Sequence, residues 1–259
     1  MAKDFRRIGG SAADVEGLVV SSSTNSSTTS TTSAASAVRP ANKVIRNAYI
    51  LLAISMIPAF LGGLAGKSFF PIGLLMSSPI MVSFGMLAIF YGLMFAIEKN
   101  NTSVVGIGLL QLFTFILGFF TGPILMYAGA IGDTGSGFSG NDLVGIAFLG
   151  TAGIFFAMAA IGSAIKKPLT GLSTFLLVGV IVLMIGVVAN IFLQIPALAL
   201  ALSCAFLFIS SLMIMYYINM AYHGGIDNYI SLTLGLVVFL YNIFTSLLHL
   251  LLAFFGGNE

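Results

Sequence analysis

The sequence contains no tryptophan, a single cysteine and only 7% charged residues, whereas 58% of its 259 residues are hydrophobic. Soluble domains carry about a quarter charged residues, so this scarcity of charge excludes an ordinary water-soluble fold. A single thiol, Cys204, excludes an internal disulfide, and no cysteine and histidine spacing typical of a metal site occurs. No basic patch interleaves with aromatic residues, so we expect no nucleic-acid partner. The composition predicts an integral membrane protein whose solvent is the lipid bilayer.

Charge is also missing from the interior of the long apolar runs. Seven runs are long enough to cross roughly 30 Å of hydrocarbon as helices. They are 45–65, 74–97, 103–131, 143–165, 169–193, 197–221 and 229–255. None alternates with period two, which argues against a barrel and predicts an all-α bundle of seven transmembrane helices. The lack of interior charge excludes a carboxylate proton relay and a retinal protein with a lysine in its last helix.

The first 42 residues lack the continuous apolar core that a signal peptide needs. Asp4, Asp14 and Glu16 argue against a mitochondrial transit peptide. The stretch SSSTNSSTTSTTSAAS, at 21–36, is of low complexity and cannot build a core. We interpret 1–42 as a disordered, Ser/Thr-rich cytoplasmic tail and 43–259 as the transmembrane domain.

Positive charge is distributed unequally between the two sides of the predicted bundle. One side carries Lys3, Arg6, Arg7, Arg39, Lys43, Arg46, Lys99, Lys166 and Lys167. The other side carries only Lys67. The positive-inside rule therefore places the N-terminus in the cytoplasm and the C-terminus outside. The glycine-rich loop 133–142 then lies outside, and the HGGIDN loop lies inside.

Small residues occur at the spacing that lets membrane helices approach closely. The pairs are Gly62 with Gly66, Gly118 with Gly122, and Ala160 with Ala164. The Gly122-Pro123 dipeptide in the third run predicts a kink or an unwound turn.

The polar side chains left in or beside the runs are neutral, and they are the candidate functional groups. They are Asn190 and Gln194 near the end of the fifth run, Tyr217, Asn219 and His223 toward the end of the sixth, and Asn242, Ser246 and His249 in the seventh. Buried amides need hydrogen-bond partners, because leaving them without one costs about 2 kcal/mol or more. Two interpretations stay open: bonds that hold helices together, or a water-lined pocket or ion path enclosed by the sixth and seventh helices.

An enzymatic alternative begins from GFSG, at 137–140, which precedes an apolar helix. Rhomboid proteases carry a serine in a similar setting, with a helix histidine as base. Ser139 and His249 would take these roles in an intramembrane serine protease. The tryptophan–arginine landmark of rhomboids is missing here, so this alternative is remote and we expect no enzyme.

Several motifs carry a resemblance to a known family. HGGIDNYI (223–230), followed by YNIFTSLLHLL (241–251), resembles the end of the Bax inhibitor-1 family. GVVANIFLQIPALALALS (186–203) resembles its bacterial YccA-like branch. Shorter matches are KVIRNAYILL (43–52), YGLMF (91–95) and GPIL (122–125), so the resemblance covers residues 43–255.

The resemblance implies a seven-helix bundle in which the C-terminal helix is central and surrounded by the other six. It also implies a regulatory protein of the bacterial inner membrane that modulates the membrane-bound protease FtsH or is its substrate. The second function that it implies is a pH-sensitive leak for calcium or another cation. Calcium would be a permeating ion there, and we expect no cofactor or resident metal.

The family's loop motif matches His223, Gly224, Gly225, Asn228 and Tyr229. The two glycines allow a sharp turn, and Asp227 or Asn228 can cap the last helix. His223 is left open for a role at the inner mouth. In calcium-leak members a pair of aspartates senses pH, and their positions are taken here by Tyr217 and Phe239. Two aromatic rings cannot attract a divalent cation, which argues against that mechanism.

Overall fold

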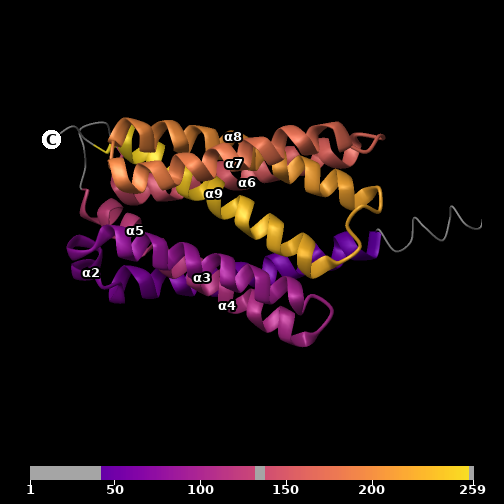
Figure 1. Cartoon of the computed structure of the whole chain (residues 1–259), viewed down its shortest axis with the longest axis horizontal. Coiled ribbons are helices and arrows are strands. Elements are labelled where there is room, and N and C mark those ends of the chain that lie inside the picture. The colour runs from indigo at the N-terminus through magenta and orange to yellow at the C-terminus, as the bar shows by residue number, and fades with distance from the viewer. Residues whose placement is uncertain (1–41, 132–137, 257–259) are drawn as a thin grey trace, which may run out of the picture.

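The computed structural model describes residues 42–131 and 138–256 (Figure 1). Within these residues, 7 helices are long and apolar enough to cross a membrane. The spans are Asn42–Phe69, α3 (Pro79–Lys99), α4 (Val104–Phe120) with α5 (Gly122–Ala130), α6 (Gly140–Ala164), α7 (Thr170–Leu193), α8 (Pro196–Tyr222) and α9 (Tyr229–Phe255). A short helix, α2 (Ile72–Ser77), lies between the first two spans. The predicted seven-helix membrane fold is confirmed, whereas the predicted tail lies outside the described residues except for Asn42.

Proline and asparagine fix where several helices begin. Pro79, Pro123 and Pro196 stand in the first turn of α3, α5 and α8, where a missing N–H costs nothing. The cap of α9 is Asn228, whose side chain accepts hydrogen bonds from the backbone N–H groups of Ile230 (2.8 Å) and Ser231 (3.3 Å). Of the two caps that the sequence allowed, the structure therefore uses Asn228.

The third span is interrupted at Thr121, immediately before Gly122-Pro123. The Thr121 N–H still bonds the carbonyl oxygens of Leu117 (3.2 Å) and Gly118 (3.0 Å), so the interruption is one residue long. Proline removes the next backbone donor and disfavours a continuous helix. The predicted kink is thus confirmed as a break between α4 and α5.

The helices form two groups with α9 running diagonally between them (Figure 1). Helices α6, α7 and α8 lie on one side, and α3, α4 and the first span lie on the other. α9 packs against α3, α4, α6 and α8, and it shares a buried cluster with the first span, whereas α7 packs against α8 and α3. α9 and the third span are the most buried spans: in each, 39% of an 18-residue apolar stretch is buried, against 6% in α3. The enclosure of α9 by all six other spans stays a prediction.

Glycine pairs bring the first span and the third span into backbone contact. A Cβ atom on Gly62 or Gly66 would overlap the carbonyl oxygens of α4, and one on Gly118 would overlap the carbonyl oxygen of Ala59. Gly122 lies equally close to the backbone of Gly66. The two predicted glycine pairs therefore face each other, as small residues do in closely packed membrane helices.

The third small-residue pair, Ala160 and Ala164, lies on α6, and its role in packing stays a prediction. Close contact between α6 and α8 passes instead through Gly162, where a Cβ would collide with the backbone of Met215. The spacing rule therefore identified the right helix but not the residue of closest approach.

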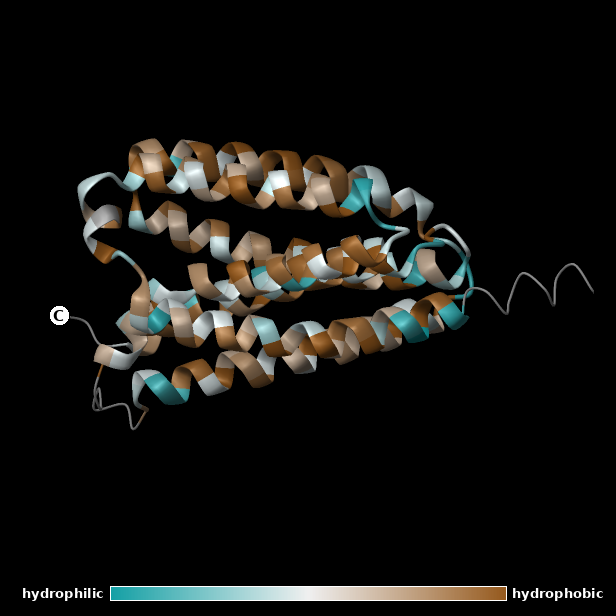
Figure 2. Cartoon of the chain, turned by 90° about the horizontal axis from the view of Figure 1, so that it is seen from below, coloured by the Kyte–Doolittle hydropathy of each residue, from teal (hydrophilic) through white to brown (hydrophobic). Residues whose placement is uncertain are grey.

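Hydrophilic residues are concentrated at the ends of the bundle, and its middle is mostly apolar (Figure 2). The described chain begins at one end, here called the N-terminal end, and finishes at the other, the C-terminal end. The described basic residues at the N-terminal end are Lys43, Arg46, Lys99, Lys166 and Lys167, and the one at the C-terminal end is Lys67. The glycine-rich loop lies partly outside the described residues.

Candidate functional site

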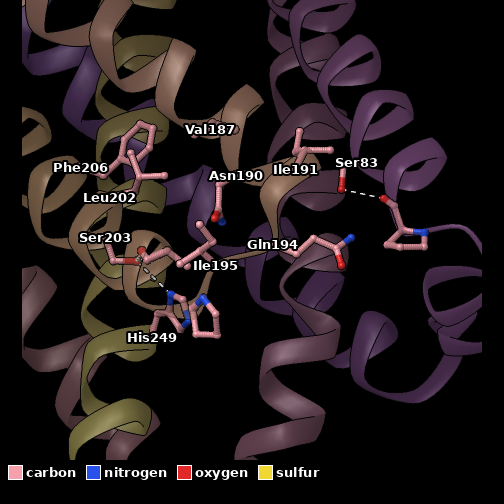
Figure 3. Close-up of a pocket in the computed structure, with 13 residues that line it drawn as sticks. Ser83, Val187, Asn190, Ile191, Gln194, Ile195, Leu202, Ser203, Phe206 and His249 are labelled. Carbon is pink, nitrogen blue, oxygen red and sulfur yellow. Dashed lines mark hydrogen bonds between the residues drawn. The ribbon is translucent and has the colours of Figure 1, made fainter.

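Two adjoining cavities lie toward the C-terminal end of the bundle. The first, the entrance cavity, measures about 480 Å³ and lies between α3, α7 and α8 (Figure 3). The second, the α9 cavity, measures about 320 Å³ and is lined by α5, α8 and α9. Ser203, Phe206 and His249 line both. Together the cavities run from the turn between α7 and α8 into the interior beside α9.

Five of the eight predicted polar candidates line these cavities. Asn190 and Gln194 line the entrance cavity, Asn242 and Ser246 line the α9 cavity, and His249 lines both. In the sequence these five residues form two separate groups, one on the fifth run and one on the seventh. The structure joins them into one site because α8 carries Ser203 between them.

Ser203 and His249 form the hydrogen bond that connects α8 to α9. The Ser203 Oγ lies 2.9 Å from His249 Nδ1 and also donates to the carbonyl oxygen of Ala199 at 2.9 Å (Figure 3). A hydroxyl has one hydrogen, so with that hydrogen on Ala199, the Nδ1–H of His249 donates to Ser203. The neutral ring then carries no hydrogen on Nε2. In this arrangement His249 cannot remove the serine proton, so the pair is not a nucleophile and base.

Several polar groups at the cavities have no hydrogen-bond partner among the described residues. The Oδ1 of Asn190 is buried and unbonded. Ser246 is 6% exposed, and neither its hydroxyl nor the side-chain amide of Asn242 is hydrogen-bonded. A buried polar group without a partner costs about 1–3 kcal/mol. These three groups are therefore not the glue between helices that one interpretation of the sequence expected.

Gln194 occupies the tight turn between α7 and α8. Its backbone is left-handed, at φ 50° and ψ 40°, which is uncommon for a residue other than glycine. Its N–H donates to the carbonyl oxygen of Asn190 at 2.8 Å, which closes the end of α7. Its exposed side chain lies at the mouth of the entrance cavity.

Asn219, at the N-terminal end, has a structural role. It is fully buried, and its Oδ1 accepts from the N–H of Leu169 at 2.9 Å. Its Nδ2 lies within hydrogen-bond distance of the carbonyl oxygens of Gly162 (3.2 Å), Ile165 (3.0 Å) and Lys167 (3.2 Å). Asn219 therefore fastens the turn between α6 and α7 to α8.

His223 contacts the same turn from the end of α8. Its Nδ1 lies 2.8 Å from the carbonyl oxygen of Asn219, and its Nε2 lies 3.0 Å from that of Lys166. A neutral imidazole has one N–H and can donate to only one of these two oxygens, whereas an imidazolium donates to both. His223 thus adds a second link to the turn that Asn219 fastens.

The remaining residues of the loop motif shape the start of α9. Gly224 has a left-handed backbone, at φ 75°, and the Gly225 N–H donates to the carbonyl oxygen of Met220 at 2.8 Å. The Nδ2 of Asn228 donates to the carbonyl oxygen of Asn101 at 2.9 Å. Tyr229 opens α9 and packs on the main hydrophobic cluster.

Tyr217 and Phe239, which the resemblance places at the family's aspartate positions, contact each other. Their ring centroids are 4.9 Å apart at 82°, and Gly235 leaves room for the tyrosine ring. This edge-to-face pair joins α8 to α9 one turn from Asn242. The contact gives the calcium-leak alternative no support.

The serine-protease alternative is wrong in its pairing of residues. Ser139 is the N-cap of α6: its Oγ donates to the Asp142 carboxylate at 2.7 Å, and its backbone N–H does so at 2.9 Å. His249 bonds Ser203 and not Ser139. Ser139 therefore completes a capping box, which explains GFSG through helix geometry.

Sequence reasoning missed Ser203 and Gln111, and one signal could have found both. Each is a polar residue inside an apolar run, which marks a candidate by default. The Nε2 of Gln111 donates to Ser55 Oγ at 3.1 Å, and its Oε1 is buried without a partner. No group of three or more His, Cys, Asp or Glu in the described ranges is arranged to hold a metal ion.

Comparison with known proteins identifies the family. The model described as "Inhibitor of apoptosis-promoting Bax1" matches residues 41–256. The chain belongs to the Bax inhibitor-1 family. An uncharacterized protein of Neisseria meningitidis is 43% identical over 218 residues, which are 84% of this chain and 93% of that protein. An uncharacterized protein of Pseudomonas aeruginosa is 36% identical over 222 residues, 85% of this chain and 93% of that one.

A third relative has a functional name. The Escherichia coli protein named modulator of FtsH protease YccA is 41% identical over 213 residues, which are 81% of this chain and 90% of that protein. A second Escherichia coli strain has a relative of the same identity named inner membrane protein YccA. The resemblance to the Bax inhibitor-1 family and its YccA-like branch, predicted from the motifs, is confirmed.

Proposed function

We propose that this Bax inhibitor-1 family member is a regulatory protein of the bacterial inner membrane that modulates a membrane-bound protease of the FtsH type, or is its substrate. The observation that carries the proposal is the 41% identity, over 81% of the chain, to a protein named a modulator of FtsH. The identity extends over 213 residues and not over one motif.

The polar contacts of the described residues agree with a role that is not catalytic. Asn219 and His223 fasten a turn, and Ser139 caps a helix. Ser203 gives its only hydrogen to a backbone carbonyl. None of these groups is arranged as an activated nucleophile, so the proposal assigns the chain no reaction of its own.

The orientation in the proposal follows from charge. Five described basic residues lie at the N-terminal end and one lies at the C-terminal end. The positive-inside rule then places the N-terminal end, and the 41 residues that precede the first span, in the cytoplasm. We propose that this Ser/Thr-rich segment is the handle by which the protease engages the chain.

The test measures the lifetime of the chain in cells. Full-length protein and a variant lacking residues 1–40 are produced in Escherichia coli with and without active FtsH, and their decay is followed by pulse-chase labelling. The full-length chain is expected to decay faster when FtsH is active, and the truncated chain to last several times longer. Deletion of 257–259, at the opposite end, is the matched control and should leave the lifetime unchanged.

A reconstituted assay separates a modulator from a mere substrate. Purified FtsH and the full-length chain are placed in the same liposomes with a second membrane substrate, whose degradation is timed. A modulator changes the rate at which the second substrate disappears, while a chain of unrelated fold with the same tail does not. Equal lifetimes with and without FtsH, together with an unchanged rate in liposomes, would overturn the proposal.

A further inference from the structure

The α9 cavity presents hydrogen-bond acceptors. Ser203 donates its hydrogen to the carbonyl oxygen of Ala199 (2.9 Å), and Thr245 donates its hydrogen to that of Tyr241 (2.8 Å). Each of these hydroxyl oxygens therefore offers only its lone pairs to a molecule in the cavity. With the Ser203 hydrogen on Ala199, a neutral His249 donates from Nδ1 to Ser203 and keeps a lone pair on Nε2. Three of the polar groups that line this cavity can therefore only accept.

Two further groups at the cavity are free to bind. Ser246 is 6% exposed, lines the cavity, and has no bond from its hydroxyl to another described residue. Asn242, one turn away on the same face of α9, likewise has an unbonded side-chain amide. A serine in a helix usually bonds the carbonyl four residues earlier, as Thr233 and Thr245 do here. Ser246 does not, so its oxygen is available to a ligand.

The charge of the ligand follows from the groups that are present and those that are not. The lone pairs of Ser203 and Thr245, together with the oxygens of Asn242 and Ser246, favour a cation or a hydrogen-bond donor, although the Asn242 Nδ2 and the Ser246 hydroxyl can also donate. Calcium sites are built with carboxylates, and neither cavity has Asp or Glu in its lining. Neutral oxygens suffice for monovalent ions, as the carbonyl-lined filters of potassium channels show.

The entrance cavity adjoins the α9 cavity, because Ser203 and His249 line both, and it offers a route from the turn between α7 and α8. Asn190 contributes a buried Oδ1 with no partner along this route. α7 ends and α8 begins beside the entrance, so the opposite partial charges of the two helix ends offset each other. The side-chain oxygens therefore decide which ion is favoured.

We propose that the α9 cavity is a binding site for a monovalent metal cation, sodium or potassium, with the oxygens of Asn242, Ser246, Ser203 and Thr245 as its ligands. The ion enters from the C-terminal end through the entrance cavity. The linings of the two cavities include Asn242 but neither ring of the Tyr217–Phe239 contact, so the proposed site is a bound position and not an open pore.

The test uses the purified full-length chain in lipid nanodiscs and measures its thermal midpoint. Sodium chloride or potassium chloride replaces choline chloride at constant ionic strength, so that only a specific ion raises stability. We expect a saturable rise in the midpoint with at least one of the two ions. For the variant Asn242→Leu/Ser246→Ala, we expect the ion concentration that gives half of the rise in the midpoint to increase about tenfold or more. A tenfold increase corresponds to a loss of about 1.4 kcal/mol in binding free energy.

Thr233→Val is the matched control, because it removes a hydroxyl from the same helix outside the cavity, and it should keep the wild-type ion dependence. Calcium chloride at equal ionic strength should raise the thermal midpoint no more than choline chloride does. If the double variant does not fold, sodium-23 NMR line broadening on the wild type, with potassium as competitor, and Ser246→Ala alone replace it. Equal midpoints in sodium, potassium and choline, an undiminished effect in the variant, or stronger stabilisation by calcium would each overturn the proposal.

Discussion

The two halves of α9 carry similar polar residues, but only the C-terminal half, where Thr245 and His249 are bonded, also has polar side chains without a described partner. In the half at the N-terminal end, Asn228, Ser231 and Thr233 are all bonded: Ser231 donates to Glu98 (2.8 Å), and Thr233 lies within hydrogen-bond distance of the carbonyl oxygens of Tyr229 (2.7 Å) and Ala48 (3.2 Å). In the half at the C-terminal end, Asn242 and Ser246 have unbonded side chains beside a cavity. One helix thus supplies both interhelical bonds and a candidate ligand site.

The aromatic contact between these halves marks the change. Phe239 and Tyr217 contact each other between Thr233 and Asn242 along α9. On the bonded side, Ser231 reaches the Glu98 carboxylate and Thr233 reaches the Ala48 carbonyl, because α3 and the first span pack closely on α9. On the other side, a cavity lies beside Asn242 and Ser246, and no neighbouring helix offers them a partner among the described residues. The difference shows that the element opposite a polar residue in a membrane helix decides its role. The residue either bonds a neighbouring helix or remains available to bind a ligand.

The largest expected effect comes from removing the aromatic contact. Phe239→Ala should lower the free energy of unfolding by about 3 kcal/mol, because a buried ring leaves a cavity behind. Phe254→Ala, on the same helix but 74% exposed, should change it by less than about 0.5 kcal/mol. Unfolding titrations of both variants in mixed detergent micelles measure the two values. Equal losses would mean that the Tyr217–Phe239 contact does not organise α9.

A smaller effect distinguishes a bonded asparagine from an unbonded one. Asn219→Leu should cost about 2 kcal/mol, because the Leu169 N–H and the carbonyl oxygens of the α6–α7 turn lose their partner. Asn242→Leu should cost about 0.5 kcal/mol or less, since no protein bond is lost. Both are measured in choline chloride, where sodium and potassium contribute nothing. A cost at Asn242 as large as that at Asn219 would remove the distinction between the two halves.

The smallest expected effect is the difference in unfolding free energy between removing two hydroxyls of α9. Thr233→Val keeps the shape of the side chain and removes its hydrogen bonds, so we expect a loss of about 0.6 kcal/mol. Ser246→Ala in choline chloride should be neutral within about 0.3 kcal/mol, because its hydroxyl has no described partner. Repeated thermal unfolding in nanodiscs resolves the difference. A larger loss at Ser246 than at Thr233 would show that the cavity half of α9 is also held by hydrogen bonds.

The sequence by itself determined the seven spans, the kink before Gly122-Pro123 and the glycine pairs of the first and third spans. Each follows from a local rule: the length of an apolar run, the missing N–H of proline, or the absent side chain of glycine. The family could also be read from its motifs, because these are contiguous stretches of chain.

Only the tertiary structure decided which polar side chains find partners. Asn219 and Asn242 are both amides in apolar runs, and nothing in their neighbours along the chain indicates that the first is bonded and the second is not. Their fate depends on how each helix is rotated about its axis and which element lies opposite, here the α6–α7 turn for Asn219 and a cavity for Asn242. The pairing of Ser203 with His249 was settled in the same way, because it joins two helices across 46 residues of chain.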